Sequence, residues 1–111
     1  MPGVPELSPA EVAERWPDYA SGEHVVLLDV REPVEVATAA VEAALHIPMR
    51  EVPGRLAELN TEKPLVVMCH SGGRSQRVAQ FLLESGFSNV FNLKGGIDAW
   101  STQIDSRVPR Y

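Results

Sequence analysis

The chain has 111 residues, of which 44% are hydrophobic and 23% are charged, and its formal net charge at pH 7 is −5. Residues 1–111 are therefore expected to form one globular domain whose core needs no metal or disulfide. The acidic balance argues against binding to nucleic acid, which requires a basic surface. No apolar run approaches the roughly 18 residues that cross a bilayer. Residues 1–6 lack the basic and apolar regions of a secretory signal, so we expect a cytoplasmic protein.

The first half of the chain alternates helix and strand signals. Ser8 can cap a helix, Pro9 suits its first turn and Glu11 completes a capping box. Residues 25–30 form a nearly continuous apolar run, which is typical of a strand covered on both faces. In order, the predicted elements are a helix over 9–16, a strand over 25–30, a helix over 33–41, a strand over 44–47 and a helical turn over 53–59.

The second half contains the most periodic helix signal. Val78, Phe81 and Leu82 recur on one stripe between polar residues, and Gly86 follows as a left-handed cap. The predicted elements are a strand over 65–69, a helix over 76–85, a strand over 90–93 and a final helical turn over 97–101. Residues 102–111 show no pattern that predicts structure.

Strands that alternate with helices indicate an α/β fold with a central parallel sheet of about five strands and helices on both faces. In such sheets, functional sites form beyond the carboxyl ends of the strands. The predicted strands end near residues 29–32, 48–50, 69 and 94–96. We therefore expect these segments to meet at one crevice.

Cys69 is the only cysteine, so it cannot form a disulfide within the chain. It ends an apolar strand, precedes a loop that contains Gly72 and Gly73, and is followed by a helix. The glycines allow backbone N–H groups to point inward, and the helix start adds partial positive charge, which together stabilise a thiolate. The pattern therefore favours a reactive cysteine over the alternative, an inert buried thiol.

A family resemblance is carried by three motifs, which are Leu28-Asp29-Val30-Arg31-Glu32-Pro33, Cys69-His70-Ser71-Gly72-Gly73-Arg74-Ser75 and Leu93-Lys94-Gly95-Gly96-Ile97-Asp98-Ala99-Trp100. With them the chain resembles the single-domain rhodaneses of the sulfurtransferase family. The resemblance implies that Cys69 takes a sulfane sulfur from thiosulfate or a persulfide donor and carries it as a persulfide. A thiophilic acceptor, cyanide in vitro or a thiol in vivo, then receives that sulfur. The implied substrate-binding residues are His70, Ser71, Gly72, Gly73, Arg74 and Ser75, and we expect no metal or cofactor.

Charged residues near the loop are candidates for supporting roles. Arg74 either attracts an anionic donor or pairs with Asp29 or Glu32 to hold the loop in shape. Arg31 faces the same choice, and structural pairing is the favoured interpretation. Asp29 is interpreted as a loop anchor rather than a base, since a nearby arginine would keep it ionised. Lys94 follows another strand end and adds positive charge there.

The sequence departs from the family pattern at two places. His70 stands where rhodaneses often carry arginine, and we expect its side chain to point into water. Residues Ala39–Ala44 replace a Gly-His-Ile-Pro-Gly-Ala stretch. Without those glycines and that proline the segment can extend the preceding helix, so the site wall on that side is expected to differ.

Two other functions share parts of this pattern. Protein tyrosine phosphatases and their rhodanese-like relatives need five residues between cysteine and arginine, whereas four residues separate Cys69 from Arg74, which disfavours phosphatase or arsenate reductase activity. A non-catalytic interaction module built on the same fold typically lacks the cysteine. The expected partners are a small-molecule sulfur donor and a thiol or protein acceptor, with no nucleic acid and no membrane. We expect the chain to be a monomer.

Overall fold

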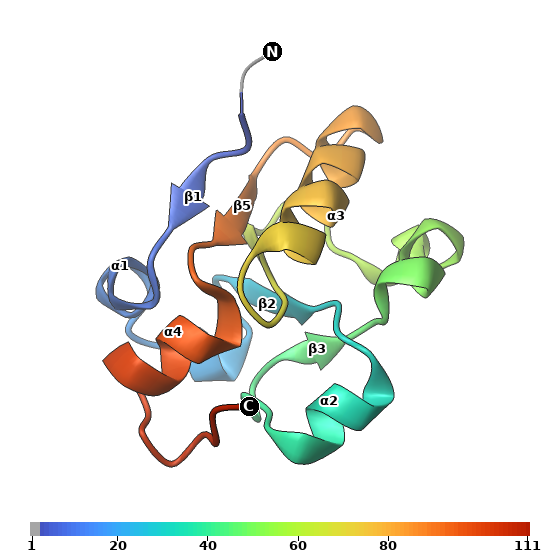
Figure 1. Ribbon diagram of the computed structural model, residues 1–111. Helices are drawn as coiled ribbons and strands as arrows, with labels where there is room; N and C mark the ends of the chain where they lie inside the picture. The colour runs from blue at the N-terminus through green and yellow to red at the C-terminus, as the bar shows by residue number, and fades with distance from the viewer. Residues whose placement is uncertain (1–2) are drawn as a thin grey trace.

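A five-stranded parallel sheet forms the centre of the protein (Figure 1). The structure is a computed structural model that describes residues 3–111. The strands are β1 (Glu6–Leu7), β2 (Val26–Asp29), β3 (Leu45–His46), β4 (Leu65–Met68) and β5 (Val90–Leu93). They pair in the order β1-β5-β4-β2-β3, and each pairing is parallel. Because β4 is the central strand, the residue that follows it lies in the middle of the carboxyl edge of the sheet.

Helices cover both faces of this sheet. The α-helices are α1 (Pro9–Arg15), α2 (Pro33–Thr38), α3 (Gly73–Glu84) and α4 (Gly96–Gln103), and 3-10 turns span Tyr19–Ser21, Met49–Gly54 and Leu56–Glu58. α1 and α4 pack together on one face, and α3 packs with the turn Met49–Gly54 on the other (Figure 1). The predicted α/β class, with a parallel sheet between two helical layers, is confirmed.

Alternate residues of β4 point to opposite faces of the sheet, and both sets are apolar. Val66 and Met68 pack in the cluster that contains Trp100 of α4, whereas Val67 packs in the cluster that contains Val78 of α3. Trp100 is only 1% exposed. A strand buried on both faces has no solvent side, which explains why its sequence shows no polar alternation.

α2 is shorter than predicted and does not continue through the alanine-rich stretch. It ends at Thr38, and Ala39 is extended, with φ −157° and ψ 136°. The carbonyl of Ala39 accepts a hydrogen bond from Nη2 of Arg31 at 2.7 Å, which holds the backbone away from helical geometry. The expectation that residues 39–44 extend the helix is therefore wrong.

Other elements also differ from those predicted. α3 begins at Gly73 rather than Gln76, and α4 is a full helix rather than the turn predicted over 97–101. The sequence pattern does not predict β1, because two residues are too few to show a period and only pairing with β5 defines them.

The tail, residues 104–111, folds back onto the domain although its sequence predicts no structure. Ser101 Oγ donates a hydrogen bond to the carbonyl of Val108 at 2.5 Å. Arg110 forms an ion pair with Asp98 of α4, with Nε and Oδ1 2.8 Å apart. Val108 is buried in the core cluster on this face. The tail therefore runs from α4 to the marked C-terminus, which lies near α2 (Figure 1).

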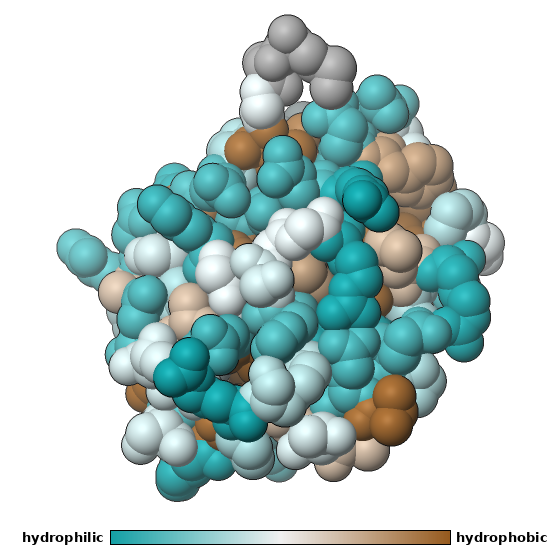
Figure 2. All heavy atoms as spheres, viewed as in Figure 1, coloured by the Kyte–Doolittle hydropathy of each residue, from teal (hydrophilic) through white to brown (hydrophobic). Residues whose placement is uncertain are grey.

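The face of the protein in Figure 2 is mostly hydrophilic, with hydrophobic residues scattered among polar ones. Val34 on α2 is the most exposed large hydrophobic residue among residues 3–111, at 73%. Isolated apolar residues of this kind are ordinary on a globular surface. None of the helices in the described part of the chain is long and apolar enough to cross a membrane.

Candidate active site

Cys69 directly follows β4 and is 1% exposed. The loop after it turns sharply at Gly72, where φ is 121°, and enters α3 at Gly73. This turn aims the backbone N–H of Gly72 at the Cys69 Sγ, 3.1 Å away. Gly72 is needed for this geometry because L side chains rarely adopt such a positive φ. Gly73 has no comparable constraint, since its φ is helical and a Cβ there would meet no atom within 4 Å.

Hydrogen-bond donors surround the sulfur and favour its ionised form. Burial acts to raise the pKa of the Cys69 thiol. Hydrogen bonds from the Ser75 hydroxyl and from the backbone N–H groups of Ser75, Gly72 and Ser71 outweigh burial, so this pKa lies below its usual value. Since Gly73 is the first residue of α3, the backbone N–H groups of its first turn, including that of Ser75, have no partner within the helix.

Ser75 also connects the sulfur to β5. Its hydroxyl oxygen lies 3.3 Å from Cys69 Sγ, 2.5 Å from Oδ1 of Asn92 and 3.2 Å from the carbonyl of Gly72. Asn92 Nδ2 in turn donates to Gly72 O and to Oε2 of Glu6, both at 3.2 Å. A hydroxyl carries one proton, so Cys69 and Asn92 compete for the same donor.

Asn92 is a site residue that sequence reasoning missed. It is 1% exposed and lies on β5, which pairs with β1 on one side and β4 on the other, between apolar neighbours. A polar residue inside an apolar strand was the available signal, because a buried amide needs hydrogen-bond partners. Pairing of β5 with β4 then places it beside the strand that carries Cys69.

The start of α4 supports the loop from behind. The backbone N–H of Ile97 donates to Cys69 O at 2.9 Å, and that of Asp98 donates to His70 O at 3.2 Å. The chain passes so close that a Cβ on Gly96 would lie 2.4 Å from Cys69 O. The ends of β4 and β5 therefore meet, as expected from the parallel sheet.

Arg31 and Asp29 form a buried ion pair at the end of β2. Arg31 is 0% exposed and Asp29 1%. Nε of the arginine donates to Oδ1 at 2.9 Å and Nη2 donates to Oδ2 at 2.6 Å. Burial acts to lower the pKa of Arg31, but hydrogen bonds to Asp29 and Tyr111 outweigh it and raise this pKa. The guanidinium also holds Ala39 O, so the pair fixes the segment on both sides of α2.

Arg74 pairs with Glu35 of α2, a partner that the sequence did not suggest. Nη1 and Nη2 of Arg74 donate to the two carboxylate oxygens of Glu35 at 2.6 and 2.8 Å. The expected partners are already engaged, because Asp29 binds Arg31 and Glu32 accepts from Arg50 at 2.6 Å. The Arg74 hydrogen bond is the main cause that lowers the pKa of Glu35 to about 2. In this geometry Arg74 anchors the loop to α2.

His70 does not point into water, contrary to expectation. Its imidazole stacks on the ring of Tyr111, with centroids 4.3 Å apart and planes 22° apart. Its Nε2 is buried and has no hydrogen-bond partner among residues 3–111. Tyr111 belongs to the tail, whose sequence shows no periodicity or motif. The sequence therefore gives no sign that Tyr111 contacts His70, 41 residues away.

The Lys94 side chain is exposed and makes no hydrogen bond or ion pair with the loop among the described residues. Its backbone N–H donates to Leu7 O at 2.8 Å. Its charge also acts on Glu11 of α1, whose pKa is lowered mainly by Ser8 and to a smaller extent by Lys94.

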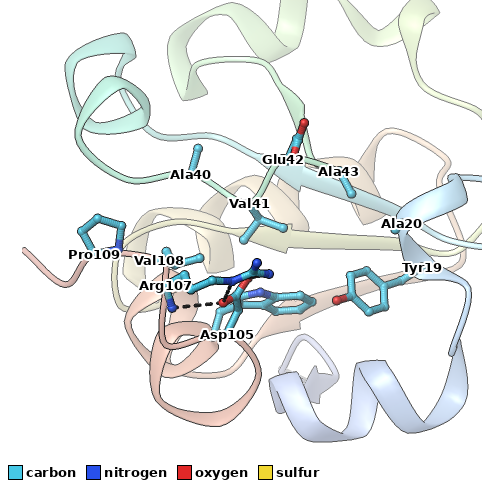
Figure 3. Close-up of a pocket in the computed structure, with 11 residues that line it drawn as sticks. Tyr19, Ala20, Ala40, Val41, Glu42, Ala43, Asp105, Arg107, Val108 and Pro109 are labelled. Carbon is cyan, nitrogen blue, oxygen red and sulfur yellow. Dashed lines mark hydrogen bonds and ion pairs between the residues drawn. The ribbon is translucent and has the colours of Figure 1, made fainter.

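A cavity of about 480 Å³ lies between the tail, the alanine-rich stretch and Tyr19 (Figure 3). Its lining comprises Tyr19, Ala20, Ala40, Val41, Glu42, Ala43, Trp100, Asp105, Arg107, Val108 and Pro109. The loop residues 69–75 do not line it. The alanine-rich stretch that departs from the family pattern thus contributes to this cavity together with the tail.

Comparison with known proteins agrees with this geometry. The family model described as Rhodanese-like domain matches residues 9–103. A sulfurtransferase from Allochromatium vinosum is 36% identical over 98 residues, which cover 88% of this chain and 89% of that protein. The thiosulfate sulfurtransferase GlpE from Actinobacillus pleuropneumoniae is 35% identical over 95 residues, which cover 86% and 84%.

Solved structures show the same architecture. The crystal structure of a rhodanese-related protein from Thermoplasma volcanium superposes with a TM-score of 0.75 at 28% identity, and the match covers 95% of each chain. The family match and the structural match both cover most of the chain, including the Cys69 loop of residues 69–75. The chain therefore belongs to the rhodanese-like domain family, and at that level it is a sulfurtransferase.

Proposed function

We propose that the protein moves a sulfane sulfur from thiosulfate or a persulfide donor to a thiophilic acceptor through a persulfide on Cys69. The observation that carries this proposal is the Cys69 Sγ itself, held 3.1 Å from the Gly72 N–H and 3.3 Å from the Ser75 hydroxyl. Similarity to a relative named as a thiosulfate sulfurtransferase supports thiosulfate as one donor. No step requires a metal or cofactor.

In the first half-reaction the Cys69 thiolate attacks the outer sulfur of thiosulfate. A bond forms between Sγ and that sulfur, and the bond between the two sulfur atoms of thiosulfate breaks. Sulfite leaves with the electron pair, and Cys69 becomes a persulfide anion. The lowered pKa of Cys69 supplies the thiolate, which is the nucleophilic form.

In the second half-reaction an acceptor attacks the outer sulfur of the persulfide. With cyanide the products are thiocyanate and the Cys69 thiolate, and with a thiolate the product is a new persulfide. The donors around Sγ are fixed by Gly72 and α3, so they stabilise the anion before and after transfer without rearrangement. Because Glu35 neutralises Arg74, these backbone and hydroxyl dipoles supply much of the positive potential at the sulfur.

Thiocyanate formation from thiosulfate and cyanide tests the proposal. We expect the wild-type protein to turn over, and Cys69→Ser to show no activity above the uncatalysed rate. A matched control is Ser88→Ala, because the Ser88 side chain is exposed and lies outside the loop of residues 69–75. Turnover by Cys69→Ser, or none by the wild type with either thiosulfate or a persulfide donor, contradicts the proposal.

A further inference from the structure

Tyr111 joins three parts of the site that the strands and helices alone do not connect. Its hydroxyl donates to Oε2 of Glu35 at 2.8 Å and accepts a hydrogen bond from Nη1 of Arg31 at 2.9 Å. Its ring stacks on His70, the residue after the nucleophile. Glu35 lies on α2, Arg31 follows β2, and His70 belongs to the Cys69 loop. The phenol therefore bridges the loop and α2 on one side of Cys69.

The tail is fastened well enough to hold Tyr111 in this position. Arg110 binds Asp98 through two hydrogen bonds, at 2.8 and 3.1 Å. Val108 is buried against α4, and its carbonyl is held by Ser101. These contacts bring the chain to the site from the α4 side. The position of Tyr111 is thus set by the docked tail as well as by its own hydroxyl.

Two observations indicate that Tyr111 limits access to the sulfur. Cys69 is 1% exposed, so a reactant must pass the side chains that surround the loop to reach Sγ. His70, the next residue along the loop, stacks on Tyr111, and its Nε2 is buried and unpartnered among the described residues. A buried ring nitrogen without a partner is unfavourable, and movement of Tyr111 would expose it to water or to a reactant. Local movement of the Tyr111 side chain therefore has a favourable contribution at His70, while Arg110 and Val108 keep the tail itself in place.

We infer that Tyr111 is a specificity-determining residue, because its ring, fixed between His70, Arg31 and Glu35, forms a wall of the entrance to Cys69. This inference rests on the proposed sulfur transfer. Small donors of the size of thiosulfate reach the sulfur beside the docked ring. Bulkier reactants, such as the thiol of a peptide or protein, require the ring to move.

Alkylation of Cys69 by reagents of different size measures this access without any sulfur transfer. The probes are iodoacetamide, which is small, and N-(1-pyrenyl)maleimide, which is bulky, and intact mass gives the rate constant for each. Cys69 is the only thiol, so each adduct reports on one site. In Tyr111→Ala we expect the bulky reagent to react at least about tenfold faster, or about 1.4 kcal/mol lower in activation free energy, with a much smaller change for iodoacetamide.

Two further variants separate size selection from a general loosening of the fold. Tyr111→Phe keeps the ring and loses both hydrogen bonds of the hydroxyl, and we expect a smaller acceleration of the bulky reagent than in Tyr111→Ala. Arg107→Ala is the tail control, because the hydrogen bonds of Arg107 go to Asp105, and its side chain is 90% exposed. We expect wild-type rates for this variant, and thermal unfolding checks that all three are folded.

Equal acceleration of both reagents in Tyr111→Ala, or no acceleration of the bulky one, overturns the inference. The same outcome in Arg107→Ala as in Tyr111→Ala also overturns it. Failure of the proposed sulfur transfer is recognised separately, as absence of thiocyanate formation in a protein whose Cys69 still reacts with iodoacetamide.

Discussion

Replacing Ser75 by alanine tests how the protein activates Cys69. The Ser75 hydroxyl has one proton for three acceptors, which are Asn92 Oδ1 at 2.5 Å, Gly72 O at 3.2 Å and Cys69 Sγ at 3.3 Å. A hydrogen bond to a charged group contributes about 1.5–3 kcal/mol, and about 1.4 kcal/mol corresponds to one pKa unit. Because the proton is shared, we expect the lower end of this range, so that the Cys69 pKa rises in Ser75→Ala and the thiolate becomes about tenfold harder to form.

The pH dependence of Cys69 alkylation by iodoacetamide measures this pKa. Below the thiol pKa the rate falls with the thiolate fraction, so we expect Ser75→Ala to react about tenfold more slowly at neutral pH and to reach the wild-type plateau at alkaline pH. Ser71→Ala is the matched control, because that hydroxyl is exposed. An unchanged or lower pKa in Ser75→Ala, or an equal rise in Ser71→Ala, would refute the role assigned to the Ser75 hydroxyl.

Three further predictions follow from other contacts. Glu35→Gln should lower the free energy of unfolding at neutral pH by about 1–2 kcal/mol, a value reduced from the full shift because Arg74 is partly exposed. The pKa of Glu35 in the folded protein is lowered to about 2. The stability that its ionised carboxylate contributes is therefore present above the unfolded-state pKa and is lost as pH falls toward 2. Unfolding free energies from urea titrations of the two proteins should converge in acid. Gly96→Ala should destabilise by about 2–4 kcal/mol or prevent folding, since the new Cβ meets Cys69 O at a positive φ, whereas Gly54→Ala, where a Cβ meets nothing, should be tolerated. Trp100→Ala should cost about 3–5 kcal/mol in thermal or urea unfolding, because it empties a fully buried position. The Glu35 prediction fails if the difference in unfolding free energy between wild type and Glu35→Gln is the same at acid and at neutral pH. A stable Gly96→Ala, or a loss below about 1 kcal/mol for Trp100→Ala, would contradict the packing around those residues.

The parts of the fold that could be predicted are those whose signal is local. The apolar run before Cys69 and the stripe that includes Val78 and Leu82 mark β4 and α3, because each element buries a repeating set of its own residues. The capping box at Ser8 is likewise contained within four residues, and the structure forms it as predicted. The loop at Cys69 was predictable for the same reason.

The missed features all depend on contacts between distant segments. Arg74 binds Glu35, 39 residues away, and the choice among nearby carboxylates depends on which of them Arg31 and Arg50 already occupy. Tyr111 reaches His70 only because α4 and the tail turn back across the sheet edge. No spacing in the sequence encodes such pairings, since they are set by the order of strands and by the path of the tail.

Intact-mass measurement of the wild-type protein after incubation with thiosulfate shows directly whether Cys69 carries a transferred sulfur. We expect a mass gain of one sulfur atom on the wild type, no gain in Cys69→Ser, and loss of the added sulfur when cyanide is supplied. A gain that persists in Cys69→Ser, or a wild-type protein that acquires no sulfur while iodoacetamide still modifies Cys69, would contradict it.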